Sequence, residues 1–272
     1  MKELEHIAVE VRKKLLQNIV KAGGGHTGGS MSSVDILVAL YFKVLNIDPG
    51  NPQWKERDRF IMSKGHSVES YHAILANRGF FSEEVLDSYG DFQSILAGHP
   101  TRKVPGIEIN SGALGHGLSV GVGMALAAKR SGSSWRTFVL MGDGEHGEGS
   151  IMEAAAAAGH YNLDNLVAII DRNGLQISGK TEEVLSIENL EAKYRACGWS
   201  VGTCNGHDMD ELISKLNHTP FEKGSPSVLI AHTVKGKGVS FMEDRATWHH
   251  KLPSPEQLQQ ALEELNLMVE EQ

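Results

Sequence analysis

Two glycine-flanked polar residues, Asp143 and Asn173, have the setting of ligands for a metal ion and a diphosphate. Asp143 follows the apolar run TFVLM within GDGEHGEG, and Asn173 follows the run LVAII within DRNG. Magnesium is bound by oxygen atoms, commonly a few from the protein together with phosphate oxygens, so a carboxylate, an amide oxygen and a turn carbonyl would suffice. An Asp-Gly or Asn-Gly pair alone is a common turn sequence, and only the two together favour a site.

The stretches around these residues predict a parallel sheet. Three short apolar runs, at residues 137–141, 166–170 and 227–231, have the character of buried parallel strands. The alanine-rich stretch 150–162 suits a helix packed closely on a sheet, which gives βαβ order. We therefore predict an α/β fold with a doubly wound, mostly parallel sheet flanked by helices. Ligands bind beyond the carboxyl ends of strands in such sheets, where Asp143 and Asn173 would lie side by side.

Helical patterns precede and follow the predicted sheet. Residues 4–22 repeat apolar side chains every four positions, and a second helical pattern covers residues 34–44. The glycine-rich stretch GGGHTGGSMS between them predicts a loop that carries His26. The acidic stretch from Pro255 predicts a last amphipathic helix.

Composition narrows the classes of function. The chain has 272 residues, of which 40% are hydrophobic, and we expect one domain over residues 1–272. Its net charge of -8 comes from interspersed charges without a basic block, so no nucleic-acid partner is expected. Cys197 and Cys204 have neither zinc-ligand nor redox spacing. No apolar run has the length of a membrane span and the N-terminus does not have the pattern of a signal peptide, so we expect a cytoplasmic protein without a membrane partner.

The stretch from GDGEHGEG to Asn173 resembles the thiamine-diphosphate fingerprint in the form found in transketolases. Further segments resemble that family in the same order, from about residue 20 to residue 253: GGGHTGGSMS, MSKGHSVESYHA, LAGHP, NSGALGHGLSVGVGMALA and HTVKGKGVSFMEDRATWHHKLP. The resemblance implies the diphosphate-binding domain of a transketolase, with thiamine diphosphate and Mg²⁺ as cofactors. Such an enzyme transfers a two-carbon ketol unit from a ketose to an aldose.

The resemblance also implies a role for individual residues. The magnesium ligands would be Asp143, Asn173 and the main-chain carbonyl of Leu175. The remaining cofactor contacts would come from His66 and Gly144 at the diphosphate and from Gly112 and Leu114 at the rings. The substrate channel would be lined by His26, His99 and His249, since imidazoles can donate hydrogen bonds or relay protons near neutral pH. Glu148 matches a glutamate that links two sites at a subunit interface. The departures from the family pattern are Thr27, Ala113, His116 and His250.

The resemblance covers only the first half of full-length transketolases. It therefore implies that the pyrimidine-binding and C-terminal domains belong to a second polypeptide, and that the two chains form a heterotetramer which is active on sugar phosphates. Without that partner we expect no activity. The donor and acceptor sugars are not specified by this half.

Three other interpretations remain open from the residues. Gly115, Gly117 and Gly121 form a glycine pattern that, with Asp143 as the acid on a ribose, would fit an NAD(P)-binding dehydrogenase, although the preceding GIEIN is a weak strand. A regulatory remnant without chemistry would not need intact metal ligands. Within the same cofactor family, a subunit of a deoxyxylulose-phosphate synthase or a ketoacid dehydrogenase is the nearer alternative.

Overall fold

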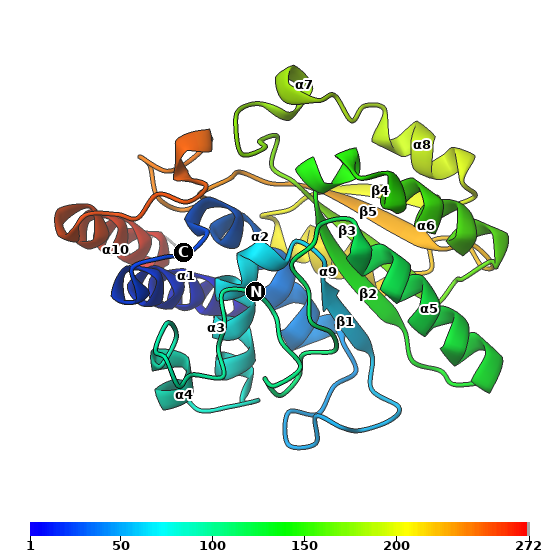
Figure 1. Ribbon diagram of the computed structural model, residues 1–272, viewed down its shortest axis with the longest axis horizontal. Helices are drawn as coiled ribbons and strands as arrows, with labels where there is room; N and C mark the ends of the chain where they lie inside the picture. Colours follow the sequence, from blue (N-terminus) through cyan, green and yellow to red (C-terminus); the bar gives the residue numbers. More distant parts are fainter. Residues whose placement is uncertain (271–272) are drawn as a thin grey trace.

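The computed structural model describes residues 1–270 and contains one five-stranded sheet (Figure 1). All strand pairs are parallel, and the order across the sheet is β1-β2-β3-β5-β4. The strands are β1 (Arg59–Met62), β2 (Thr137–Gly142), β3 (Leu166–Arg172), β4 (Ser200–Asn205) and β5 (Ser227–His232). Because β2 and β3 are neighbours, with Gly142 opposite Asp171, the two predicted ligand segments leave the same edge of the sheet.

Alternate side chains of the central strands face two separate hydrophobic cores, as the period of two in a strand requires. In β2, Phe138 and Leu140 pack into one core, whereas Val139 and Met141 pack into the other. All four side chains are fully buried. Both faces of the sheet must therefore be covered by helices, which explains why the strands read as continuous apolar runs.

Helices cover both faces (Figure 1). The first core is covered by helices from both ends of the chain, namely α1 (Lys2–Ala22), α2 (Thr27–Ala39), α3 (Val68–Arg78), α9 (Met209–Asn217) and α10 (Pro255–Glu270). The second core is covered by α5 (His116–Ser131), α6 (Gly149–His160) and α8 (Leu190–Ala196). The short elements are η1 (Leu40–Val44), η2 (Gly65–Ser67), α4 (Glu83–Asp87), η3 (Gly144–Gly147), α7 (Thr181–Val184) and η4 (Ala246–Trp248). The predicted doubly wound parallel fold is confirmed.

Most predicted elements are present, with two omissions and one correction. The three predicted strands are β2, β3 and β5, and the N-terminal, alanine-rich and C-terminal helices are α1, α6 and α10. The sequence patterns did not predict β1 and β4. The loop predicted over GGGHTGGSMS is wrong in its second half, because α2 begins at Thr27 and only the residues up to His26 lie outside a helix. None of the helices within residues 1–270 is long and apolar enough to cross a bilayer.

Two of the three glycines that suggested a dinucleotide site, Gly117 and Gly121, pack α5 against the sheet. A Cβ on Gly117 would lie 2.4 Å from the Ser63 Cβ, and one on Gly121 would lie 2.6 Å from a methyl of Val139. The segment before α5 is irregular, whereas a dinucleotide fingerprint requires a strand there. The dehydrogenase alternative is therefore wrong, because the segment before these glycines is not a strand.

Candidate functional site

A cavity of about 390 Å³ lies beyond the carboxyl ends of β2 and β3. It brings together segments that are far apart in the sequence, including the start of α2, the turn after β1, the loop before α5 and the segment after β5. The residues that line it are His26, Gly29, Lys64, His66, Gly112, Leu114, Gly142, Asp143, Gly144, Glu145, Asn173, Leu175, Gln176, Ile177, Ser178, Lys235, His249 and His250. Most of the predicted site residues thus share one cavity.

Asp143 follows β2, and its side chain is almost completely buried. Its Oδ1 accepts a hydrogen bond from the Gly144 amide at 2.9 Å, and its Oδ2 accepts from the Gly174 amide at 2.7 Å. Arg172 donates to Oδ2 at 3.0 Å, and the Thr181 hydroxyl does so at 3.2 Å. Burial raises the pKa of the Asp143 carboxyl above its usual value, although Arg172 opposes the rise. The carboxylate therefore also organises the loop after β3.

Asn173 and Leu175 add neutral oxygen atoms to the same wall of the cavity. The Asn173 Oδ1 accepts a hydrogen bond from the Leu175 amide at 3.2 Å, which fixes the turn. The Asn173 amide nitrogen lies 3.4 Å from the Ser32 hydroxyl, so the amide oxygen is the atom left for a cation. A carboxylate, an amide oxygen and a main-chain carbonyl form a hard donor set, and this set fits Mg²⁺.

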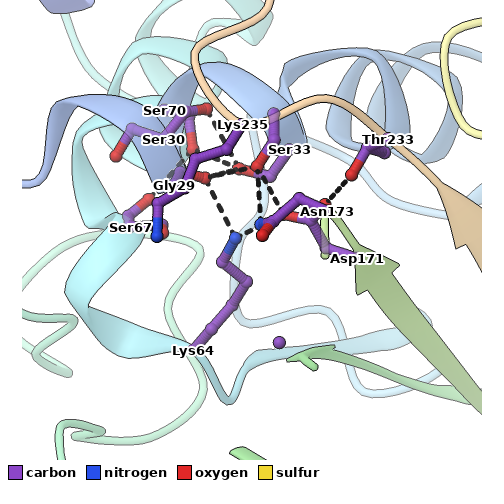
Figure 2. Close-up of polar contacts among 12 residues, drawn as sticks. Gly29, Ser30, Ser33, Lys64, Ser67, Ser70, Asp171, Asn173, Thr233 and Lys235 are labelled. Atoms are coloured by element: carbon purple, nitrogen blue, oxygen red, sulfur yellow. Dashed lines mark hydrogen bonds and ion pairs between the residues drawn. The ribbon is translucent and has the colours of Figure 1, made fainter. Parts of the chain in front are cut away.

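A buried ion pair supports this wall from behind (Figure 2). Lys64 follows β1, and its ammonium contacts Asp171 and donates to the Gly29 carbonyl at 2.9 Å. Asp171 is completely buried and also accepts from the Ser32 hydroxyl at 2.7 Å and from the Thr233 hydroxyl. Burial alone would raise the pKa of Asp171, but Lys64 and these hydroxyls hold it below its usual range. The pair connects α2 with the ends of three strands.

Lys235 is a second buried lysine at the cavity and is 2% exposed. Figure 2 draws it together with Lys64 and with Gly29 of α2. The Nζ of Lys235 lies 2.9 Å from Nδ1 of His249. Burial, and then the charge of Lys64, lowers the pKa of Lys235 to about 8. Two lysines that have lost hydration and share a cavity wall form a positive environment, which suits a diphosphate.

The predicted substrate-channel histidines converge around His26. The centroid of the His26 ring lies 5.2 Å from that of His66, 5.5 Å from that of His249, 4.4 Å from that of His250 and 6.0 Å from that of His99. Burial lowers the pKa of His26 to about 4 and that of His249 to about 3, and neighbouring positive groups add to both shifts. These two rings are therefore neutral near pH 7 and can donate or accept hydrogen bonds.

The loop before α5 carries Gly112 and Leu114 into the cavity. Gly112 lies against His99, because a Cβ on this glycine would be 3.4 Å from Cδ2 of the imidazole. The buried carboxylate of Glu145 holds the end of this loop by accepting a hydrogen bond from the Gly115 amide at 2.9 Å. His99 itself does not line the cavity directly.

Glu148 is the predicted site residue that lies farthest from this arrangement. It is exposed at the start of α6 and does not line the cavity. A Cβ on Gly115 would lie 2.6 Å from the Cβ of Glu148, which places the glutamate behind the loop that carries Leu114. Its proposed place at a subunit interface stays a prediction.

Several residues of the site were not predicted from the sequence. Lys64 and Lys235 are within the segments MSKGH and HTVKGKG, and Asp171 precedes Asn173 by two positions. Their proximity to glycine-flanked histidines and to Asn173 was the available signal. Nothing local shows that a lysine is buried, because lysines are mostly exposed in folded proteins.

Glu69 is a further residue that the sequence did not reveal, and it holds His26 in place. It is 3% exposed, and its Oε1 accepts hydrogen bonds from the His26 amide at 3.1 Å and the Tyr89 hydroxyl at 2.9 Å. Its Oε2 accepts from the Ser30 hydroxyl at 2.7 Å. Burial raises the pKa of this carboxyl, and the hydrogen bonds oppose the rise. The side chain of His26 caps no backbone N–H at the start of α2, and Glu69 accepts the hydrogen bond of the His26 amide there instead.

We expect Glu69→Ala to lower the turnover of the two-chain enzyme that the sequence predicts about 10- to 100-fold, because a displacement of about 1 Å in a positioned group can cost that much. Cofactor affinity should change little, since Glu69 does not line the cavity. Steady-state kinetics and cofactor titration measure the two effects. Glu69→Gln is the matched control: its amide oxygen can accept from His26 and Tyr89 and its amide nitrogen can donate to Ser30, so it should restore turnover. Equal losses in both variants would contradict the positioning role.

Comparison with known proteins agrees with a cofactor-binding enzyme domain of this kind. Residues 4–265 match the family model described as "Transketolase, thiamine diphosphate binding domain". The chain is 53% identical over 259 residues to one subunit of an apulose-4-phosphate transketolase from Phocaeicola vulgatus, with 95% of this chain and 92% of that protein covered. It is 42% identical over 264 residues to one subunit of a 6-deoxy-6-sulfo-D-fructose transketolase from a Clostridium species, with 97% of this chain and 96% of the relative covered.

Comparison with a solved structure leads to the same family. The transketolase from Campylobacter jejuni superimposes with a TM-score of 0.92 at 31% identity, covering 98% of this chain but 43% of that one. The chain thus spans nearly the whole of the two subunits and less than half of the full-length enzyme. It belongs to the transketolase family and contains the family's thiamine-diphosphate-binding domain. The predicted family, fold and enzyme class are confirmed.

Proposed function

We propose that this chain is the Mg²⁺- and thiamine-diphosphate-binding subunit of a two-chain transketolase that moves a two-carbon ketol unit from a ketose phosphate to an aldose phosphate. The observation that carries the proposal is the content of one cavity: an oxygen donor set, two buried lysines and neutral imidazoles. Relatives of nearly equal length are named as transketolase subunits, which supports division of the enzyme between two chains.

Each group of residues has a separate task in this proposal. Asp143, Asn173 and the Leu175 carbonyl hold the magnesium ion, and Lys235 with His66 faces the diphosphate. Lys64 acts from behind by holding Asp171 and the start of α2. The bound cofactor supplies the nucleophilic carbon that makes and breaks the bond next to the ketose carbonyl.

The imidazoles bind and orient the sugar. His26 and His249 are neutral near pH 7, so each can donate one hydrogen bond to a sugar oxygen and accept one from a hydroxyl. His99 lies behind Gly112, where it would face the far end of the substrate. Exclusion of water on the open side requires a second wall, which a pyrimidine-binding domain on the partner chain would supply.

We further infer that two copies of each chain form a heterotetramer in the cytoplasm. Ile177 and Leu185 support a large partner surface beside the cavity, because they follow the metal-binding turn and are 63% and 56% exposed. Exposed apolar side chains that gather beside a functional cavity are typical of an interaction surface.

A complementation assay tests the proposed function. We expect no ketose-to-aldose transfer by the isolated chain with Mg²⁺ and thiamine diphosphate, and activity that rises to a plateau at a stoichiometric ratio when the second chain is added. Replacing the ketose by pyruvate in the same assay tests a deoxyxylulose-phosphate synthase or a ketoacid dehydrogenase. Full turnover by the single chain would contradict the two-chain proposal, and turnover with pyruvate alone would contradict the ketose donor.

A further inference from the structure

Three imidazoles at the cavity have the arrangement of a nitrogen-donor metal site. His26, His249 and His250, hereafter the histidine cluster, each offer a ring nitrogen, and these atoms all lie within 4.8 Å of one another. The ring of His250 lies 4.4 Å from that of His26 and 4.5 Å from that of His249, measured between centroids. His250 is therefore the residue that makes a pair of channel histidines into a set of three.

We propose that the histidine cluster binds a divalent transition-metal ion of the Zn²⁺ class, at a site separate from the magnesium ligands. Imidazole nitrogens suit Zn²⁺, Ni²⁺ and Cu²⁺, whereas Mg²⁺ requires oxygen ligands. The donor set of Asp143, Asn173 and Leu175 and the histidine cluster thus differ in the ion they select. A fourth position would face the cavity and hold water or a sugar oxygen, as in zinc sites with three protein ligands.

The geometry allows such a site after a small rearrangement. Zinc–nitrogen bonds of about 2.0–2.1 Å bring tetrahedral ligand atoms to about 3.4 Å from one another, so separations of up to 4.8 Å within the cluster must shorten by up to about 1.4 Å. His250 is exposed and can move, whereas His249 is buried and His26 is half-buried. The cluster therefore has a fixed part and one adjustable ligand.

Hydrogen bonding decides which nitrogen of His249 is available. Lys235 lies 2.9 Å from Nδ1, so Nε2 is the nitrogen left for a metal ion. A metal ion on Nε2 leaves the proton of the His249 ring on Nδ1, where it points at a neutral Lys235 amine. The Lys235–His249 pair therefore releases one proton when the metal ion binds. Metal binding therefore costs free energy, because the Lys235 ammonium must lose its charge beside the metal cation.

Metal binding has a functional consequence that rests on the proposed function. If His26 and His249 bind the ketose, a metal ion on the same nitrogens excludes the sugar from them. The site would then be inhibitory, and metal and ketose would compete. Binding itself does not depend on this step.

Titration of the cofactor-free chain with Zn²⁺ against a chromophoric chelator measures binding. We expect His250→Ala to weaken Zn²⁺ binding at least about 10- to 100-fold, the loss that even an outer-sphere partner can cause. His250 is exposed, so this variant should fold. Two controls should bind like the unmodified chain: Asp143→Ala, which removes a magnesium ligand, and His218→Ala, which removes an exposed imidazole at the end of α9. Unchanged affinity in His250→Ala, or loss in Asp143→Ala instead, would overturn the site.

Cobalt gives a second readout, because Co²⁺ bound by nitrogens in a tetrahedral site absorbs visible light much more strongly than Co²⁺ in an octahedral oxygen site. We expect the strong absorption in the unmodified chain and its loss in His250→Ala. For the inhibitory role, Zn²⁺ should raise the apparent KM for the ketose in the assembled enzyme. If the chain binds Zn²⁺ but Zn²⁺ does not inhibit ketose turnover by the assembled enzyme, metal and ketose do not compete. The proposed function would still stand.

Discussion

We expect Asp143→Ala to lose the proposed magnesium-dependent binding of thiamine diphosphate. The substitution removes the charged member of the proposed donor set of Asp143, Asn173 and the Leu175 carbonyl, and Mg²⁺ binding relies on a few such protein oxygens plus the phosphates. We expect cofactor affinity to fall by about 100-fold or more, since loss of even an outer-sphere partner of a metal costs about 10- to 100-fold. Calorimetric titration with the cofactor, with and without Mg²⁺, measures the effect.

The same carboxylate organises the loop after β3, so the variant needs a matched control. Thr181→Val removes the hydrogen bond of 3.2 Å that the Thr181 hydroxyl donates to Oδ2 of Asp143, and it leaves the carboxylate in place. It should retain most of the cofactor affinity. If Thr181→Val lost as much affinity as Asp143→Ala, loop order would explain the result and the metal-ligand assignment would be wrong. The magnesium-free titration separates the two further, because only a metal ligand makes the loss depend on Mg²⁺.

The position of Asp143 and Asn173 at one edge of the sheet could be predicted from the sequence because its signals are local. Asp143 and Asn173 each follow a buried apolar run, and parallel strands that end at the same edge bring such residues together. The two strands that were not predicted lack this signal. β1 has four residues, and β4 is an edge strand whose side chains are mostly not buried, so neither reads as a buried apolar run.

The start of α2 could not be predicted from local preference. Thr27, Gly28 and Gly29 form its first turn although glycine disfavours helices. Burial explains the result, because every residue of α2 is buried. A Cβ on Gly29 would lie 2.8 Å from the Ser67 hydroxyl, so close packing requires glycine there. Tertiary packing thus overrides local helix propensity at the point where the helix reaches the cavity.

The polar contacts between distant segments could not be predicted from the sequence either. Lys64 and Asp171 are 107 positions apart, and the Glu69 carboxylate meets the His26 amide across 43 positions. Spacing carries no information about such pairs. The histidines that converge around His26 could be singled out only through resemblance to a family, because an isolated histidine in a loop has no distinctive pattern.

The second large effect concerns stability. Lys64→Met leaves the completely buried Asp171 carboxylate without its cation, and removing one partner of a buried ion pair costs about 3–5 kcal/mol. We expect the free energy of unfolding to fall by about that amount, measured by urea denaturation of the cofactor-free chain. Methionine has similar length and fills the space of the lysine stem, so a cavity does not add to the loss.

Lys64→Met/Asp171→Asn is the variant that separates charge from packing. It removes both charges, while the asparagine can still accept from Thr233 and donate to Ser32, so we expect it to recover more than half of the stability lost in the single variant. The pH dependence gives an independent check. The pKa of Asp171 is lowered in the folded chain, so its contribution is complete above about pH 4 and is lost as the pH falls through the folded value. The unmodified chain should therefore lose this contribution in acid, whereas the double variant has none to lose. A double variant as unstable as Lys64→Met at neutral pH would show that the lysine acts through its packing and its bond to the Gly29 carbonyl, and the ion pair would then contribute little.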